Sequence, residues 1–150
     1  MLGFTLVTDD PTRDHRTLME MALRLFPQWE ADIGEEGFVI RCGARFIRVV
    51  SFGTEAERAF YEEGELDGLP MQSPRFALVS FRQPVDGRLF LKALLLMWPA
   101  AWVDNDYVFA SGTAFREALR VAPLWSLTGP LPTTSSRSSA TVIFPTRIDR

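Results

Sequence analysis

A weak internal repeat, offset by 72 residues, is the feature of this chain that most constrains its fold. Residues 4–8 align with residues 76–80, and the match continues without a gap to about residue 32. Aligned positions fall where the local pattern predicts the same structure: a strand, a helix, a proline stop and another strand. We therefore predict a single α+β domain, in which a mostly antiparallel sheet carries packed helices. Its two β-α-β-β-α-like halves would span about residues 4–63 and 76–121.

The composition is that of an ordinary globular domain. Among 150 residues, 47% are hydrophobic and 23% are charged, which suits one domain with a proper core. We assign residues 1–125 to this domain. Residues 126–150 are rich in Pro, Ser and Thr, and we expect a tail outside the core that is either flexible or an edge strand. The single cysteine, Cys42, alternates with Phe38 and Ile40, which predicts a buried thiol.

The local patterns predict the elements in more detail. Asp10-Pro11 is typical of a helix start, and Pro27 ends that helix. Thr54 and Glu57 match a capping box, which predicts a short helix that fades near Gly64. The predicted strands are 4–8, 30–33, 38–42, 46–52, 75–82, 101–103 and 107–110, and the other predicted helices are 84–98 and 112–121.

The predicted helix 84–98 is apolar on almost every side. Only Arg88 and Lys92, one turn apart, interrupt its hydrophobic surface. Helices that are hydrophobic all round lie in the centre of a fold. We therefore expect this helix to be the most buried element of the molecule.

The charge balance bears on the class of partner. The formal net charge is −3, and it becomes −5 when residues 126–150, with three Arg and one Asp, are set aside. An acidic body argues against direct nucleic-acid binding, which needs cations for phosphate, and suits a basic protein partner. The richest apolar run, 89–103, contains Lys92 and Pro99 and is too short for a membrane span. Without a secretion signal at the start, the expected location is the cytoplasm.

Catalytic and metal-binding signatures do not emerge from the sequence. His15 is the single histidine, and the sequence has no Gly-x-Ser-x-Gly elbow and no phosphate loop. The acids of Asp104-Asn105-Asp106, together with Asp32, are the best set for Mg²⁺ or Ca²⁺. The same residue types favour a hairpin turn, and a partner-binding surface is a third interpretation. We predict a turn, with no catalytic residue, no metal and no cofactor.

Acidic and aromatic side chains form the candidate partner-binding set. Residues 55–67 hold six acids against one Arg, and the acidic turn 34–37 is the second concentration of negative charge. Such runs are often merely solvated, but negative surfaces also accelerate encounter with a basic partner. Aromatic rings beside acids are frequent in protein interfaces. The candidate contact residues are Glu35, Glu36, Glu62, Glu63, Glu65, Asp67, Trp102, Asp104, Asp106 and Tyr107.

Several short motifs are similar to those of a known class of proteins. They are Trp98-Pro99, the run 102–107 (Trp-Val-Asp-Asn-Asp-Tyr), Ser111-Gly112, Phe115 and Leu119-Arg120. Together they resemble the C-terminal half of small bacterial immunity proteins, which neutralise toxins of polymorphic or contact-dependent systems.

The resemblance implies a non-enzymatic α+β protein that binds a cognate toxin in the cytoplasm and blocks its active cleft. The toxin would be basic, and a nuclease is one candidate. Two other functions stay open. One is a small-molecule regulatory domain with a ligand between the two halves. The other is an enzyme in which Asp32, Asp104 and Asp106 converge in a pocket.

Overall fold

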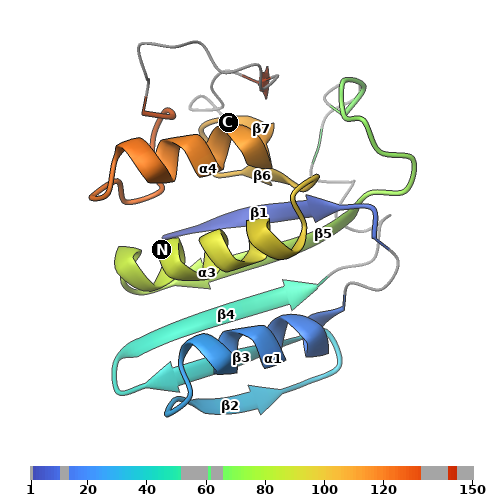
Figure 1. The fold of residues 1–150 in the computed structure, drawn as a ribbon. Helices are drawn as coiled ribbons and strands as arrows, with labels where there is room; N and C mark the ends of the chain where they lie inside the picture. The colour runs from blue at the N-terminus through green and yellow to red at the C-terminus, as the bar shows by residue number, and fades with distance from the viewer. Residues whose placement is uncertain (1, 11–13, 52–60, 62–65, 133–141, 145–150) are drawn as a thin grey trace.

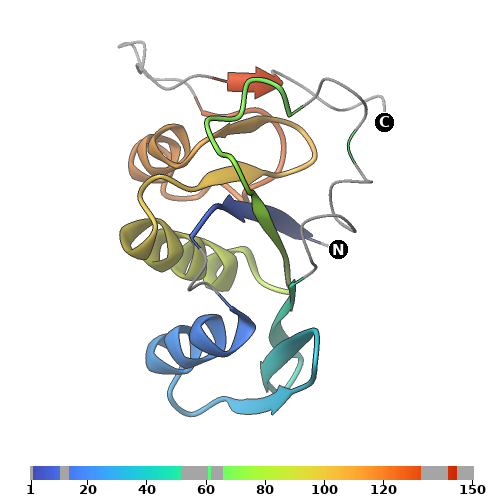
Figure 2. The same cartoon turned by 90° about the vertical axis from the view of Figure 1, so that its right-hand side faces the viewer.

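The computed structural model describes residues 2–10, 14–51, 61, 66–132 and 142–144. The described part forms one antiparallel sheet with helices packed on one face, which confirms the predicted α+β class (Figure 1). Figure 2 shows the helices together on one side of the sheet.

The strands lie in the spatial order β2-β3-β4-β5-β1-β6-β7-β8, and every neighbouring pair is antiparallel. The helices, in order from the β2 end of the layer, are α1, α3 and α4 (Figure 1). The strand bounds are β1 (Leu2–Thr8), β2 (Glu30–Ile33), β3 (Gly37–Cys42), β4 (Arg45–Ser51), β5 (Arg75–Phe81), β6 (Trp102–Asp104), β7 (Phe109–Ser111) and β8 (Val142–Phe144). The helix bounds are α1 (His15–Leu25), α3 (Pro84–Met97) and α4 (Gly112–Val121).

The main core lies between the sheet and the helices. Strand alternation sends one set of side chains to each face, so that Leu6, paired with Ala77 on β5 and Val103 on β6, lies on the helix-covered face. Phe81 and Phe90 both belong to this core, and both are almost fully buried. The hydrophobic effect of burying these side chains fixes the register, because a shift by one residue would turn them to the other face.

A second, smaller core lies on the opposite face of the sheet. Its buried members are Val7, Leu69, Phe76, Trp102 and Phe109. The ring of Tyr61 packs on this cluster, with centroids 5.6 Å from Phe76 and 5.8 Å from Phe109. The part of the sheet that these residues occupy, on β1, β5, β6 and β7, is therefore buried on both faces, whereas Leu78 on the same face of β5 is exposed.

The internal repeat is only partly reflected in the sheet. Both units run strand, helix, strand, strand, as β1-α1-β2-β3 and β5-α3-β6-β7. The first helix connects β1 to a strand four places away in the sheet, whereas α3 connects β5 to a strand two places away. Because the two units enter the sheet differently, the structure does not confirm the duplication.

The first helix starts later than the sequence suggested. Asp14, in an extended conformation, is its N-cap, and its carboxylate accepts a hydrogen bond from the backbone N–H of Thr17 at 2.8 Å. This bond satisfies one of the free donors of the first turn and lowers the pKa of Asp14. The expected start at Asp10-Pro11 is therefore wrong. Residues 11–13 lie outside the described part, as does the helix predicted from Thr54.

The prediction that α3 is the most buried element is also wrong. Phe90, Leu91, Leu94 and Leu95 are fully buried, but Leu96 on the same helix is 63% exposed. A helix in a single layer on a sheet turns one side to the sheet and the other to solvent, whatever its composition. Apolar residues on the outer side of α3 are therefore a feature of the surface.

Cys42 is exposed, which corrects the expected buried thiol. The alternation itself holds, because Phe38 and Ile40 are buried. Cys42 is the last residue of β3, next to Gly43, whose φ of 61° begins the turn into β4. The sheet leaves the core at this point.

Part of the expected tail belongs to the core. The side chain of Leu127 is 1% exposed, and the amide of Asn105 donates to the carbonyl oxygens of Leu127 at 2.9 Å and Gly129 at 3.1 Å. Further on, β8 pairs with β7, as in the edge-strand alternative. The described segment 126–132 is thus held on the domain by buried hydrogen bonds and an apolar anchor.

Candidate partner-binding surfaces

The acids predicted from the sequence do not gather on one surface. Glu35 and Glu36 are exposed in the turn between β2 and β3, at one edge of the sheet. Asp106 is exposed between β6 and β7, near the other edge. Asp67 is exposed in the loop that precedes β5. Glu62, Glu63 and Glu65 lie outside the described residues.

Two of the predicted contact residues lie inside the molecule. Asp104 is 4% exposed, and its carboxylate accepts bonds from the Tyr61 hydroxyl at 2.9 Å and from the backbone N–H of Asp106 at 2.8 Å. Trp102 is 6% exposed and packs edge-on against Phe109 with ring centroids 6.0 Å apart. Both side chains therefore support the second core and the β6–β7 turn, and they present no surface to a partner. Tyr107 is half-buried.

The turn interpretation of Asp104-Asn105-Asp106 is confirmed. The Asn105 side-chain oxygen accepts from the backbone N–H groups of Tyr107 at 3.0 Å and Val108 at 2.8 Å. Asp106 adopts a φ of 68°, a left-handed conformation that Asp tolerates better than most residues. Asn105 thus closes the turn with its oxygen and holds Leu127 and Gly129 with its amide nitrogen.

The three carboxylates that the alternative enzyme would need, all of them described, do not converge in one place. Asp32 is exposed on β2, 3.9 Å from the guanidinium of Arg41, at the sheet edge opposite to Asp104 and Asp106. In the described part of the chain, no three His, Cys, Asp or Glu side chains are placed to hold a metal ion. Between the two halves, the rings of Phe4 and Phe81 lie 6.3 Å apart in the main core.

The structure exposes a different surface, which the sequence analysis did not identify. Large apolar side chains follow one another along the outer side of α3, at spacings of four, three and four residues around Lys92. This spacing places them in one row, because residues three and four apart share a helix face. We call this row, with its neighbour Met97, the α3 ridge. Its members are Val85 (57% exposed), Leu89 (47%), Lys92, Leu96 (63%) and Met97 (42%).

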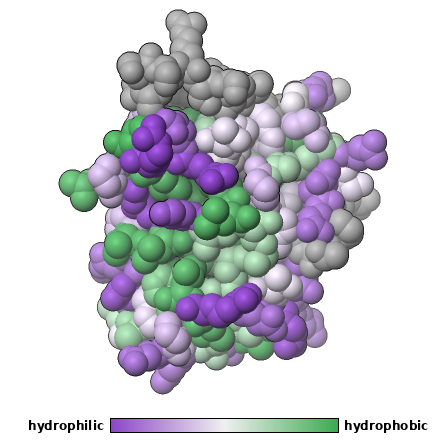
Figure 3. Space-filling model, viewed as in Figure 1, coloured by the Kyte–Doolittle hydropathy of each residue, from purple (hydrophilic) through white to green (hydrophobic). Residues whose placement is uncertain are grey.

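Figure 3 shows the α3 ridge as a green patch in the middle of the helix layer, with purple, hydrophilic side chains above and below it. Single exposed apolar residues are normal on a protein surface, whereas a contiguous apolar patch with a polar border marks an interaction site. The exposed apolar side chains on α3 lie together with a polar border, which makes this patch the candidate interaction surface.

Contacts on the inner side of α3 prevent the helix from rotating about its axis and turning the α3 ridge towards the sheet. Asp86 is fully buried and bound by Arg45, the first residue of β4. Gly87 lies close to the ring of Phe81, so that a Cβ added at Gly87 would be only 2.5 Å from the nearest ring carbon of Phe81. These contacts set the rotation of the helix, so that Leu89 and Leu96 point away from the sheet.

Arg88 fixes α3 to α4. Its guanidinium donates to the carbonyl oxygens of Leu119 at 3.0 Å, Ala122 at 2.8 Å and Trp125 at 2.9 Å. These oxygens lie at the C-terminal end of α4 and just beyond, where carbonyls lack helical partners. Partial burial lowers the pKa of Arg88. Two polar residues, Arg88 and Lys92, interrupt the hydrophobic surface of α3. Arg88 thus has a structural role, whereas Lys92 is exposed.

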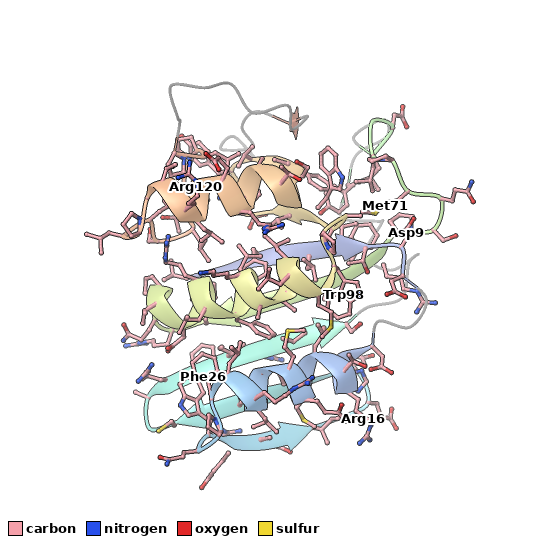
Figure 4. The ribbon with its side chains drawn as sticks, in the orientation of Figure 1. Asp9, Arg16, Phe26, Met71, Trp98 and Arg120 are labelled. Atoms are coloured by element: carbon pink, nitrogen blue, oxygen red, sulfur yellow. The ribbon has the colours of Figure 1, made fainter. Side chains whose placement is uncertain are left out.

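The borders of the ridge are basic. The three described helices carry six Lys or Arg and three Asp or Glu, and one of these acids, Asp86, is buried. Arg16 and Arg24 are exposed on α1, and Arg116 and Arg120 are exposed on α4. Figure 4 shows Arg16 and Arg120 on the two helices that flank α3. Hence the helix layer is positively charged in a chain whose net charge is negative.

Comparison with protein-family models, curated proteins and solved structures gives no match for this chain. Within the described residues, no helix has the length and hydrophobicity that crossing a membrane requires.

Proposed function

We propose that this protein acts by binding another protein, and that it is an immunity protein which neutralises a cognate toxin. The α3 ridge is the observation that supports binding. It offers four large apolar side chains in one patch, held on a helix that is fixed at Asp86, Gly87 and Arg88. A rigid apolar patch costs little conformational entropy when a partner covers it. The toxin as partner follows from the resemblance in sequence.

Inhibition would be steric. A domain of this size, seated beside or over a catalytic cleft, excludes substrate without taking part in any reaction. Interface energy is concentrated in a few central side chains that become fully desolvated. Leu89 and Leu96, about two turns apart on the outward side of α3, are the candidates for these central contacts.

The exposed acids contribute to the same function in a different way. Glu35, Glu36 and Asp106 face solvent, where charges accelerate encounter more than they strengthen the final complex. With a basic toxin, these acids would raise the association rate, whereas the α3 ridge would determine the dissociation rate.

The proposal expects a toxin domain to be encoded beside the gene for this chain, and binding to that domain tests it. The wild-type chain should bind that domain and abolish its toxicity on co-expression. The double variant Leu89→Ser/Leu96→Ser should bind at least about 100-fold more weakly, as expected for the loss of two central contacts. Leu78 is exposed on the other face of the sheet, and Leu78→Ser is the matched control that should bind like wild type.

Separate charge variants test the acids. Glu35→Lys/Glu36→Lys and Asp106→Asn should lower the association rate with little change in the dissociation rate. A wild-type chain that neither binds nor neutralises the neighbouring toxin would overturn the proposed function.

A further inference from the structure

We infer that the α3 ridge binds an amphipathic helix of the partner, whose apolar stripe is bordered on both sides by acidic residues. The inference rests on the proposed function and narrows the chemistry of the partner at this one surface. Three observations carry it: the straightness of the ridge, the charge on its borders and the consequence of pairing two copies of this chain.

The shape of the ridge suits a second helix. The row from Val85 to Leu96 is about 16 Å long, from a rise of 1.5 Å per residue. Its side chains recur at the spacing of a helix surface, and such rows pack into the grooves of another helix. An apolar stripe of three turns on the partner matches this length.

The charge on the borders specifies the flanks of that helix. Arg16 and Arg24 lie exposed on one side of α3, and Arg116 and Arg120 on the other, with Lys92 in the row itself. Glu20 and Glu117 are the acids among the outward residues of these flanking helices; Glu117 pairs with Arg120, so this pair adds no net charge, and Arg16, Arg24, Arg116 and Lys92 outnumber Glu20. Acidic residues along both borders of the partner's stripe would meet these cations, whereas basic residues would be repelled.

A second copy of this chain fits the ridge poorly. With a twofold axis across α3, each helix faces its own copy, so Arg16 approaches Arg24 of the other molecule and Glu20 approaches Glu20. With the axis along α3, α1 faces α4, and Arg24 approaches the arginines of that helix. Both arrangements bring like charges together as apolar surface is buried, which disfavours self-association.

The inference changes what is expected of the toxin. The sequence suggested a basic partner, matched to the acids of the chain. The α3 ridge instead suits a helix of the toxin that is acidic along its borders. This helix would therefore lie beside the toxin's basic cleft rather than form part of it.

Two helix-stabilised synthetic peptides test the inference without any toxin. Both carry leucines at positions i, i+4, i+7 and i+11; one has glutamates and the other lysines along the borders of this stripe. Fluorescence anisotropy in low salt should show the glutamate peptide binding at least about tenfold more tightly, with the difference shrinking in high salt. Leu89→Ser/Leu96→Ser should abolish binding of the glutamate peptide. Arg24→Glu/Arg116→Glu should reverse the preference between the two peptides.

The same measurements define how the inference fails. Equal or tighter binding of the lysine peptide to wild type would overturn it, as would binding that survives Leu89→Ser/Leu96→Ser. Failure of both peptides to bind, with concentration-dependent dimers in sedimentation that the ridge double variant abolishes, would assign the ridge to a second copy. Each of these results is independent of whether the neighbouring toxin is neutralised, so the failure of this inference and that of the proposed function are distinguishable.

Discussion

Arg45 and Asp86 form an ion pair that joins the start of β4 to the first turn of α3. The Nε of Arg45 donates to Asp86 Oδ2 at 3.0 Å, and its Nη2 donates to Oδ1. The Asp86 side chain is fully buried, whereas that of Arg45 is 47% exposed and lies over the Trp29 ring at 5.2 Å. These hydrogen bonds raise the pKa of Arg45. The pair therefore holds the helix that carries the α3 ridge, and its two members differ sharply in their access to water.

That asymmetry predicts unequal effects of removing each partner. Arg45→Ala leaves a buried carboxylate without its cation and should destabilise the fold more than Asp86→Asn, which lets Arg45 turn to solvent. For Asp86→Asn we expect a loss of about 1–2 kcal/mol. The double variant should be more stable than Arg45→Ala alone, since it removes the unpaired charge. Urea unfolding of the four proteins measures this cycle, and strictly additive losses would contradict it.

Gly87 is predicted to tolerate no side chain. In Gly87→Ala the new methyl would overlap the ring of Phe81, which is 1% exposed and has little room to shift. We expect a loss of about 1–3 kcal/mol, the usual cost of overpacking a core. Adding Phe81→Leu makes space, so the double variant should lose less than the sum of the two single changes. Thermal unfolding tests this, and a fully stable Gly87→Ala would show that α3 is not held close to β5.

The N-cap of α1 predicts a dependence on pH. Hydrogen bonds from Thr17 lower the pKa of Asp14, so its contribution to stability is present above the ordinary aspartate pKa and is lost as pH falls through the lowered value. Asp14→Ala should cost about 1 kcal/mol at neutral pH and progressively less below about pH 4. Asp14→Ser keeps a capping oxygen without the titration, so its stability relative to Asp14→Ala should not change with pH. A difference between wild type and Asp14→Ala that persists undiminished in acid would contradict the assignment of the cap.

The β6–β7 turn predicts opposite outcomes at adjacent residues. Asn105→Ala removes the bonds to Leu127, Gly129, Tyr107 and Val108, and buried groups left unpaired should cost about 2–3 kcal/mol. Asp106→Gly relieves a left-handed backbone and should leave stability unchanged or raise it by up to about 1 kcal/mol. Chemical denaturation of both variants checks this contrast, and equal destabilisation would contradict it.

Local patterns in the sequence were enough to predict most of the elements and the fold class. The apolar, β-branched and aromatic residues of β1 and β5, the helical spacing in α1 and the turn chemistry of Asn105 and Asp106 are all short-range signals. The start of α1 was misplaced because Asp10-Pro11 and Asp14 both offer a plausible cap, and the hydrogen bond to Thr17 decides between them. The burial of the described segment around Leu127 was missed, since it depends on a partner 22 residues away.

Predicting the α3 ridge would have required knowing that α3 lies in a single layer of helices on the sheet. An all-apolar helix is expected to be central, and nothing local in the sequence separates Leu95, which is fully buried, from Leu96, which is exposed. Lys92 alone marked the outward row, whereas the charge of Asp86 would also predict an outward position, and its burial depends on pairing with Arg45, 41 residues away. For the acids, the sequence predicted that Asp104 and Asp106 lie together on the surface. They are close in sequence, but Asp104 is buried and Asp106 is exposed.

Site-specific crosslinking tests most directly whether the α3 ridge is the binding surface. A photo-reactive amino acid is placed at position 96 on the ridge or, as a control, at position 78 on the opposite face of the sheet, where Leu78 is 38% exposed. After irradiation with the cognate toxin domain that the proposed function requires, a crosslink from position 96 that maps to an acidic, amphipathic helix of the toxin is the expected result. A crosslink from position 78 with none from position 96 would contradict the account.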